Sequence, residues 1–310
     1  MGNFTITIIK FAVALISLSS AMLAEAIHSL ADTGNQILLL VGLNRSQKPP
    51  DELHPFGYGP EQYFWSFVVA IMLFFIGSIV SLYEGIHKIM NPQPIEKTWL
   101  IYIILGISFL LDGFALLVAW REFNRTRIKN EGVFMAIRRS KDTNVVVCLL
   151  EDSAALVGLT LAFFGVVISE LTGIAAFDAV GSMAIGVLLA SVAFILAREV
   201  KDLLIGEAAS PANRKAIYKT IRKFHEVQAI GQVLTMHLAP KKILVTMDLE
   251  FQDDLSTDEI ENVIDRLEDA IKKAVPAVDR IFIEAEKVLG PNRMAIRPVK
   301  SESSRPLPNP

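Results

Sequence analysis

The feature that most constrains this chain is a series of long apolar stretches in its first 205 residues. Each approaches the roughly 20 residues that a helix needs to cross the hydrocarbon core of a bilayer. The six stretches are Phe4–Ser20, Ala21–Gly42, Tyr63–Ile86, Trp99–Trp120, Asn144–Ser169 and Ala175–Ala197. Hydrophobic residues make up 52% of the chain, and its mean hydropathy is +0.43. The sequence therefore predicts an all-α, six-helix transmembrane bundle over residues 1–205.

From Ser210 onward the composition is that of a soluble domain. The predicted elements are a helix from Pro211 to about Phe224, strands Gln232–Ala239 and Lys242–Phe251, a helix that follows a Ser256–Glu259 capping box and ends near Pro276, and a strand Arg280–Glu286. This α-β-β-α-β order predicts a small cytoplasmic α+β domain over residues 206–290, with an antiparallel sheet. Residues 291–310, rich in Pro and Ser, are predicted to be disordered.

The distribution of Lys and Arg predicts how the bundle is oriented. The connection between the fourth and fifth stretches carries Arg121, Arg125, Arg127, Lys129, Arg138, Arg139 and Lys141. The connections on the opposite side contain only Lys88 and Lys97. The positive-inside rule then places both termini in the cytoplasm. A compact chain without an evident targeting extension favours a bacterial cytoplasmic membrane. The net charge of −3 argues against a nucleic-acid partner.

The second apolar stretch contains a pair of metal-ligand side chains. His28 and Asp32 are four residues apart, which places both on one face of a helix. An ionisable side chain in a bilayer costs about 2.5–3.5 kcal/mol on insertion scales, so it usually faces a bundle interior, a partner or an ion path. We therefore interpret the pair as cation ligands. The alternative is a polar contact that only holds helices together.

The fifth stretch is interrupted by Glu151 and Asp152. Cys148 lies four residues before Asp152 on nearly the same helical face, whereas Glu151 points about 100° away. Asp152 is thus the expected partner of His28 and Asp32, with Cys148 or Glu151 as the fourth ligand. Imidazole, carboxylate and thiolate suit zinc or a similar first-row ion. The alternatives are a helix-packing hydrogen bond for the acidic pair and plain apolar packing for Cys148.

Other polar residues are weaker candidates. Asp51 and His54 lie in a loop that Pro and Gly residues hold, where ligands can be preorganised, although such a pair often has no role. Lys10 either snorkels or faces the bundle, and Glu25 is expected to be solvated near the extracytoplasmic end. Asp112 is expected beside the ligands, on a proton path or in a hydrogen bond to a neighbour. Asp178, at the start of the sixth stretch, is interpreted as structural.

Together these residues resemble the cation diffusion facilitator family of zinc and related divalent-metal transporters. The similar parts are the runs Ala24–Asp32, Asp51–Gly59 and Glu151–Gly158 and the α-β-β-α-β tail, so that the resemblance extends from Gly2 to about Lys287. His28, Asp32 and Asp152 match ligand positions of the family. Its usual fourth ligand, a His, is replaced here by Cys148, and Glu151 compensates in the atypical branch that this sequence is most similar to. Asp51 and His54 match a loop site, in which Tyr58 replaces a further His.

The resemblance implies a homodimeric secondary transporter that exchanges a divalent cation for protons by alternating access. The residues support the same mechanism, because a ligand must lose its proton before it binds metal. No P-loop ATPase motif and no His-Glu-x-x-His metalloenzyme motif is present, and the chain is not expected to be an enzyme or to need a cofactor. We predict export of zinc, with Mn²⁺, Fe²⁺, Co²⁺ and Cd²⁺ as alternative substrates. The rival functions are a membrane metal sensor and a monovalent cation/proton exchanger.

Overall fold

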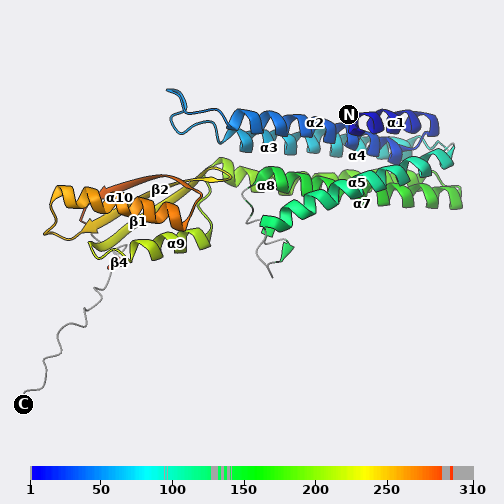
Figure 1. The fold of residues 1–310 in the computed structure, drawn as a ribbon. Coiled ribbons are helices and arrows are strands. Elements are labelled where there is room, and N and C mark those ends of the chain that lie inside the picture. Colours follow the sequence, from blue (N-terminus) through cyan, green and yellow to red (C-terminus); the bar gives the residue numbers. More distant parts are fainter. Residues whose placement is uncertain are drawn as a thin grey trace, which may run out of the picture. The chain divides into compact units, whose positions relative to one another are not determined.

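The computed structural model describes residues 2–93, 95, 97–126, 132–133, 136–137, 140, 142–287 and 294–295. It consists of two compact units, Met1–Ile205 and Gly206–Pro310 (Figure 1). Of the basic residues between the fourth and fifth apolar stretches, Arg121 and Arg125 are described. Arg127, Lys129, Arg138, Arg139 and Lys141 lie outside the described residues.

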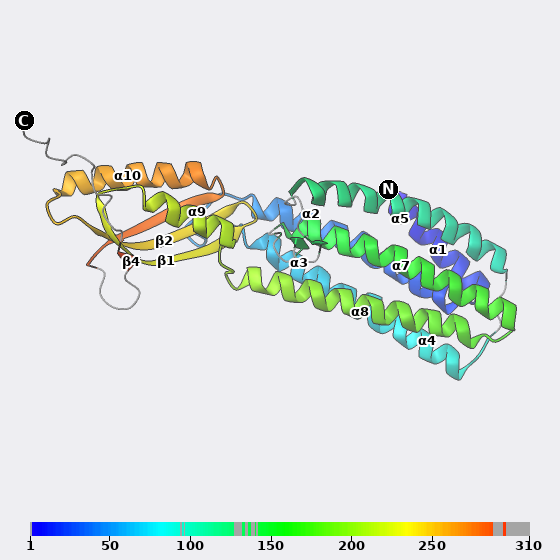
Figure 2. The same ribbon diagram turned by 90° about the horizontal axis from the view of Figure 1, so that it is seen from below.

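The first unit is a bundle of long helices. Its elements are α1 (Gly2–Ser17), α2 (Ser20–Ser46), α3 (Glu61–Met72), the π-helical turn η1 (Leu73–Ile79), α4 (Val80–Met90), α5 (Thr98–Thr126), α7 (Thr143–Thr172) and α8 (Ala176–Leu204). Helices α3 and α4 continue one another through η1 (Figure 1). Helix α2 contacts α1, α3, α7 and α8, and α7 lies between α5 and α8 (Figure 2).

Four of these helical segments have the length and hydropathy of a membrane span among the described residues: Glu61–Met90, Thr98–Arg125, Thr143–Thr172 and Ala176–Leu204. The chain is thus an integral membrane protein, while the predicted count of six spans is confirmed for four segments only. Helix α1 is apolar over the short segment Ile6–Ser17. Helix α2 is long, but Glu25, His28 and Asn35 are buried polar residues within it. Its polarity therefore faces the bundle interior rather than lipid.

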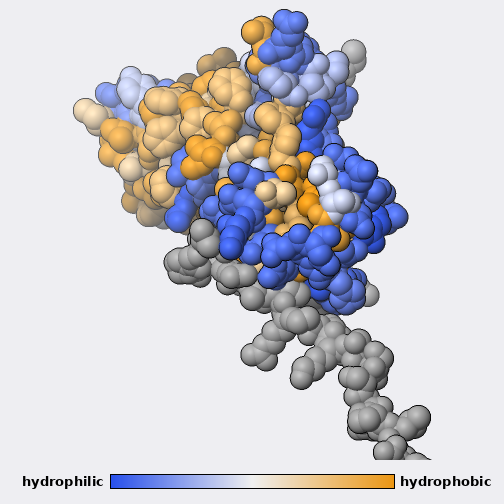
Figure 3. All heavy atoms as spheres, turned by 90° about the vertical axis from the view of Figure 1, so that its left-hand side faces the viewer, coloured by the Kyte–Doolittle hydropathy of each residue, from blue (hydrophilic) through white to orange (hydrophobic). Residues whose placement is uncertain are grey.

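The outer surface of the helical unit is apolar. Large hydrophobic side chains such as Leu15, Phe75, Leu110 and Phe194 are exposed there, and Figure 3 shows a broad area of hydrophobic residues on the surface. In water, an apolar area of this kind would be a liability. An apolar surface of this kind suits a protein that lies against lipid hydrocarbon. Helices are stable there because their backbone N–H and C=O groups hydrogen-bond within the helix.

Helices α4 and α8 approach each other closely through glycines. A Cβ atom added at Gly186 would lie 2.7 Å from Leu82 Cγ, 3.0 Å from the Leu82 backbone nitrogen and 3.0 Å from the Ser78 carbonyl oxygen. Close backbone approach through small residues is a common way for membrane helices to pack, because lipid removes the hydrophobic drive to associate. Gly106 on α5 is a natural comparison, since an added Cβ there would have no neighbour within 4 Å among the described residues.

We expect Gly186→Ala to destabilise the protein by about 1–3 kcal/mol, because backbone atoms must move to admit the methyl group. Gly106→Ala should be neutral or slightly stabilising, since alanine is the better helix former. Thermal unfolding of the purified proteins in detergent measures both effects. Equal melting temperatures for the two variants would show that the α4–α8 contact is not tight.

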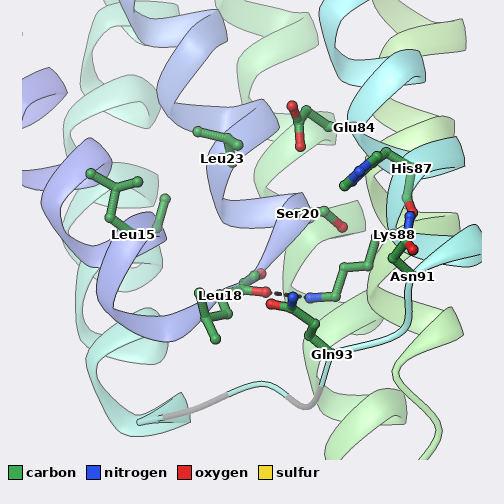
Figure 4. Close-up of a pocket in the computed structure, with 11 residues that line it drawn as sticks. Leu15, Leu18, Ser20, Leu23, Glu84, His87, Lys88, Asn91 and Gln93 are labelled. Atoms are coloured by element: carbon green, nitrogen blue, oxygen red, sulfur yellow. Dashed lines mark hydrogen bonds between the residues drawn. The ribbon is translucent and has the colours of Figure 1, made fainter.

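The turn between α1 and α2 is held by a buried acid from α8. Asp178 accepts hydrogen bonds from Ser19 Oγ (2.6 Å), the Ser20 backbone N–H (2.7 Å) and Lys88 Nζ (2.8 Å). Lys88 also donates to the carbonyl of Leu18, the residue of the turn with a positive φ of 54° (Figure 4). A cavity of about 220 Å³ lies beside this contact. Asp178 therefore joins α1, α2, α4 and α8, which agrees with the structural role expected for it.

The described residues of the second unit form a four-stranded sheet with two helices. Its elements are α9 (Pro211–Ile221), β1 (Val227–Ala239), β2 (Lys242–Phe251), α10 (Thr257–Ala274), β3 (Val278–Ala285) and β4 (Met294–Ala295). The strand order is β3-β2-β1-β4. The predicted helices and strands are confirmed, and so is the capping box, in which Ser256 N–H donates to Glu259 Oε2 at 2.8 Å. Ile217, Leu249 and Leu267 lie in the apolar core of this unit.

Two details of this unit differ from the prediction. The sheet is mixed rather than antiparallel, because β2 and β3 pair in parallel while β1 pairs antiparallel with β2. A helix, α10, connects β2 to β3, and such a crossover connection returns the chain in the same direction. Strand β4 pairs with β1 and lies in the stretch 291–310 that was predicted to be disordered. The other residues of that stretch lie outside the described residues.

Candidate metal site

His28 and Asp32 face the interior of the bundle from one side of α2. The distance between His28 Nδ1 and Asp32 Oδ1 is 3.3 Å. The His28 side chain is completely buried, and among the described residues neither of its ring nitrogens has a hydrogen-bond partner. A buried polar group without a hydrogen bond is costly. The imidazole is therefore placed as a ligand would be, with Asp32 beside Nδ1 and no hydrogen-bond partner for Nε2 among the described residues.

Glu151 of α7 completes the contact with α2. Asn35 Nδ2, one turn beyond Asp32, donates to Glu151 Oε1 at 2.5 Å. The Glu151 carboxylate also lies close enough to the Asp32 carboxylate for the two groups to interact electrostatically. Two carboxylates this close repel each other unless a proton or a cation lies between them. The contact between α2 and α7 therefore creates a buried place for one positive charge.

Asp152 and Cys148 lie elsewhere on α7. Asp152 is half-buried and interacts electrostatically with Glu151 and with Asp112 of α5. Cys148 is partly buried against the apolar core of the bundle. In the part of the chain that the structure describes, no three His, Cys, Asp or Glu side chains are grouped closely enough to hold a metal ion. The structure thus brings Glu151, rather than Asp152, to Asp32, and the predicted four-ligand set stays a prediction.

Lys10 is a polar residue of the bundle whose contacts the sequence reasoning left open. Its side chain is 1% exposed and lies 3.0 Å from Glu25 Oε1 and 3.8 Å from Asp112 Oδ2. It also donates to Ser29 Oγ at 2.5 Å. Lys10 therefore does not snorkel. The Glu25 side chain was expected to be solvated, but it is fully buried. The sequence feature that indicated this contact is the lysine itself, because a lysine within an apolar stretch needs an acidic partner inside the bundle.

The loop pair, Asp51 and His54, forms part of an exposed turn. Asp51 Oδ1 accepts from the His54 backbone N–H at 2.7 Å, and Asp51 Oδ2 accepts from Tyr58 Oη–H at 2.6 Å. The rings of His54 and Tyr58 are 4.2 Å apart. Both carboxylate oxygens of Asp51 are thus already used inside the loop.

These hydrogen bonds also affect the charge of the loop. The hydroxyl of Tyr58 and the backbone N–H of His54 lower the pKa of Asp51 below its usual value. The same hydrogen bond raises the pKa of Tyr58. Because the Asp51 pKa is lower in the folded loop, its contribution to stability is complete above the ordinary carboxyl pKa. It is lost as the pH falls through the lowered value.

The fold and the polar interior define an integral membrane protein with ionisable side chains between its helices and a small α+β unit after them. Residues 1–205 match the cation efflux transmembrane domain, and residues 209–288 match the cytoplasmic domain of cation efflux proteins. The chain therefore belongs to the cation efflux family, also called the cation diffusion facilitators, and the resemblance seen in the sequence is confirmed.

Similar proteins occur in distant organisms. The chain is 31% identical over 313 residues to the human proton-coupled zinc antiporter SLC30A9, mitochondrial, which covers 89% of this chain and 55% of that protein. It is 32% identical over 251 residues to metal tolerance protein C4 of Arabidopsis thaliana, covering 80% of this chain and 55% of the relative. It is 24% identical to the manganese efflux system protein MneP of Bacillus subtilis, covering 87% of each. The chain thus spans about half the length of the first two relatives.

Proposed function

We propose that the chain is a secondary active transporter that exports a divalent cation, zinc in the first place, in exchange for protons. The observation that carries the proposal is that Asp32 on α2 lies 3.3 Å from the buried imidazole of His28 and interacts electrostatically with the carboxylate of Glu151 on α7. Two carboxylates and an imidazole inside a membrane bundle attract one cation. Names of the relatives, a zinc antiporter and a manganese efflux protein, support the same class of substrate.

Protons and metal compete for the same ligands in this proposal. A carboxylate or imidazole must be deprotonated to bind metal, so cation entry releases protons and protonation releases the cation. Glu151 and Asp32 come from different helices, α7 and α2. A small movement of one helix against the other would change the distance between them. Asp152, Cys148 and, in the loop, Asp51 and His54 remain the proposed additional ligands.

The topology and assembly belong to the same proposal. We infer that α1 and α2 also span the membrane, which gives six spans with both termini in the cytoplasm. The positive charges near Arg121 and Arg125 support this orientation. The cytoplasmic domain matched by residues 209–288 bears the family name ZT_dimer, which supports a homodimer. A bacterial cytoplasmic membrane stays a prediction, because the relatives come from an animal, a plant and a bacterium.

Zinc flux into proteoliposomes tests the proposal. Purified protein is reconstituted with an acidic lumen that holds a zinc-sensitive dye, and zinc is added outside. We expect uptake that follows the size of the pH gradient and stops when nigericin in potassium buffer collapses it. Protein-free liposomes provide the background. If folded protein moves neither zinc nor any other divalent ion, the transporter is wrong and a membrane metal sensor takes its place. Proton-driven uptake of sodium instead would identify a monovalent cation exchanger.

A further inference from the structure

A lysine ammonium is enclosed by oxygen atoms inside the helical unit. Around Lys10 Nζ lie Glu25 Oε1 at 3.0 Å, Ser29 Oγ at 2.5 Å and Asp112 Oδ2 at 3.8 Å. The lysine is on α1, Glu25 and Ser29 are on α2, and Asp112 is on α5. Lys10 and Glu25 are almost completely buried, and Asp112 is 29% exposed. Three helices thus contribute to one charged cluster, for which we use the name Lys10 cage.

The second oxygen of Glu25 extends this cage. Glu25 Oε2 is buried and has no hydrogen-bond partner among the described residues. It lies close to Gly158 of α7, where an added Cβ would be 3.3 Å away. An unpaired carboxylate oxygen in a bundle interior is costly. Glu25 Oε2 is therefore available as a cation ligand beside the Lys10 ammonium.

The composition of the cage differs from that of the candidate metal site. Two carboxylates and a hydroxyl are hard oxygen ligands, which suit Mg²⁺, Ca²⁺ or Mn²⁺. The site of Asp32 and Glu151 instead includes the imidazole of His28, which suits zinc. Without the ammonium, the Lys10 cage would bring two acidic groups together around an empty centre. The lysine is tethered to α1, so its effective concentration at this place is high.

We propose that Lys10 is a built-in cation that occupies a second, all-oxygen cation position formed by Glu25, Ser29 and Asp112 and closes it to metal ions. The inference rests on the proposed function, since it concerns which cations the transporter admits. Lys10 then acts as a specificity-determining residue. It confines divalent cations to the site with the imidazole and removes a site that would favour Mn²⁺.

Mn²⁺ binding by a Lys10→Met variant tests this role. Methionine keeps a long side chain but has no charge. Full-length protein in detergent is titrated with Mn²⁺, and free Mn²⁺ is measured from its electron paramagnetic resonance signal. We expect Lys10→Met to bind one more Mn²⁺ per chain than the wild type. The double variant Lys10→Met/Glu25→Gln serves as the matched control and should lose the additional ion. An equal number of bound Mn²⁺ ions in the wild type and in Lys10→Met would overturn the proposal.

Folding is checked in the same experiment. Buried acids without a counter-charge destabilise a bundle, so Lys10→Met is purified with and without Mn²⁺ and compared by size-exclusion chromatography. A variant that is monodisperse only with Mn²⁺ supports the proposal, because the ion replaces the ammonium. A variant that is unfolded under both conditions overturns it. Zinc flux of the wild type is measured separately. If the wild type shows no zinc flux but Lys10→Met binds an additional Mn²⁺, the proposed transport function is refuted, whereas the proposed cation position at Lys10 is supported.

Discussion

Replacing Asp32 by Asn should lower proton-driven zinc uptake at least about 100-fold, since even partners of metal ligands cost 10–100-fold when they are removed. Asp32 lies 3.3 Å from His28 and interacts electrostatically with the carboxylate of Glu151. Asparagine has nearly the same shape but carries no charge, so the pair of acids that attracts a cation becomes a single acid. The measurement is zinc-dye fluorescence in proteoliposomes under a fixed pH gradient, at several zinc concentrations.

Variants of α7 show which of its residues is the partner of Asp32. Because Glu151 accepts a hydrogen bond from Asn35 and interacts electrostatically with Asp32, we expect Glu151→Gln to reduce uptake as strongly as Asp32→Asn. Asp152→Ala is also expected to abolish uptake if the matched ligand position of the family is used. Cys148→Ala tests the proposed additional ligand on the same helix, and it should reduce uptake less than Glu151→Gln does, because the thiol packs against the apolar core. Normal uptake by Glu151→Gln, with loss in Cys148→Ala, would contradict the site derived from the structure.

Replacing Asp178 by Ala should destabilise the protein by about 3–5 kcal/mol, the usual cost of breaking a buried ion pair from one side. The change removes the acceptor of three hydrogen bonds from Ser19 and Ser20 at the start of α2 and leaves the Lys88 ammonium buried without its acid. The exposed fractions of the Asp178 and Lys88 side chains are 0% and 7%, so water does not replace the lost partner. Thermal unfolding in detergent should show this as a large fall in the melting temperature.

A double variant separates the charge effect from the loss of hydrogen bonds. In Asp178→Ala/Lys88→Met the unpaired ammonium is gone, and the missing contacts are the hydrogen bonds of Ser19 and Ser20 and the one that Lys88 donates to Leu18. We expect the double variant to be more stable than Asp178→Ala alone, by an amount that a double-mutant cycle provides. If adding Lys88→Met lowers the stability further, the ion pair is not what holds the α1–α2 turn.

Several features of the fold could be predicted from the sequence because they depend on local patterns. The capping box of Ser256 and Glu259 involves residues three positions apart, and it forms as expected. The long apolar stretches likewise become helices, although two of the six are not apolar or long enough to qualify as spans by themselves. Helix α2 falls short because the same polar residues that indicate a site, such as His28 and Asp32, reduce its hydropathy.

Contacts between distant parts of the chain were decided only by the tertiary structure. The spacing of His28 and Asp32 places both on one helix face, but it contains no information on which side of α7 faces them. Glu151 and Asp152 differ by about 100° around the helix axis, and the packing of α7 between α5 and α8 directs Glu151 to α2. A residue's sequence neighbours cannot specify that rotation.

The same reason explains the other corrections. The acids that neutralise Lys10 are 15 and 102 residues further along the chain, at Glu25 and Asp112, and they come together only when α1, α2 and α5 pack. The parallel pairing of β2 and β3 depends on where α10 returns the chain. The sequence by itself determined the helices, the strands and the residue types available for cation chemistry. Tertiary packing decided which of those residues meet. A buried charge without a partner is costly, so each charged side chain pairs with a group on the helix packed against it.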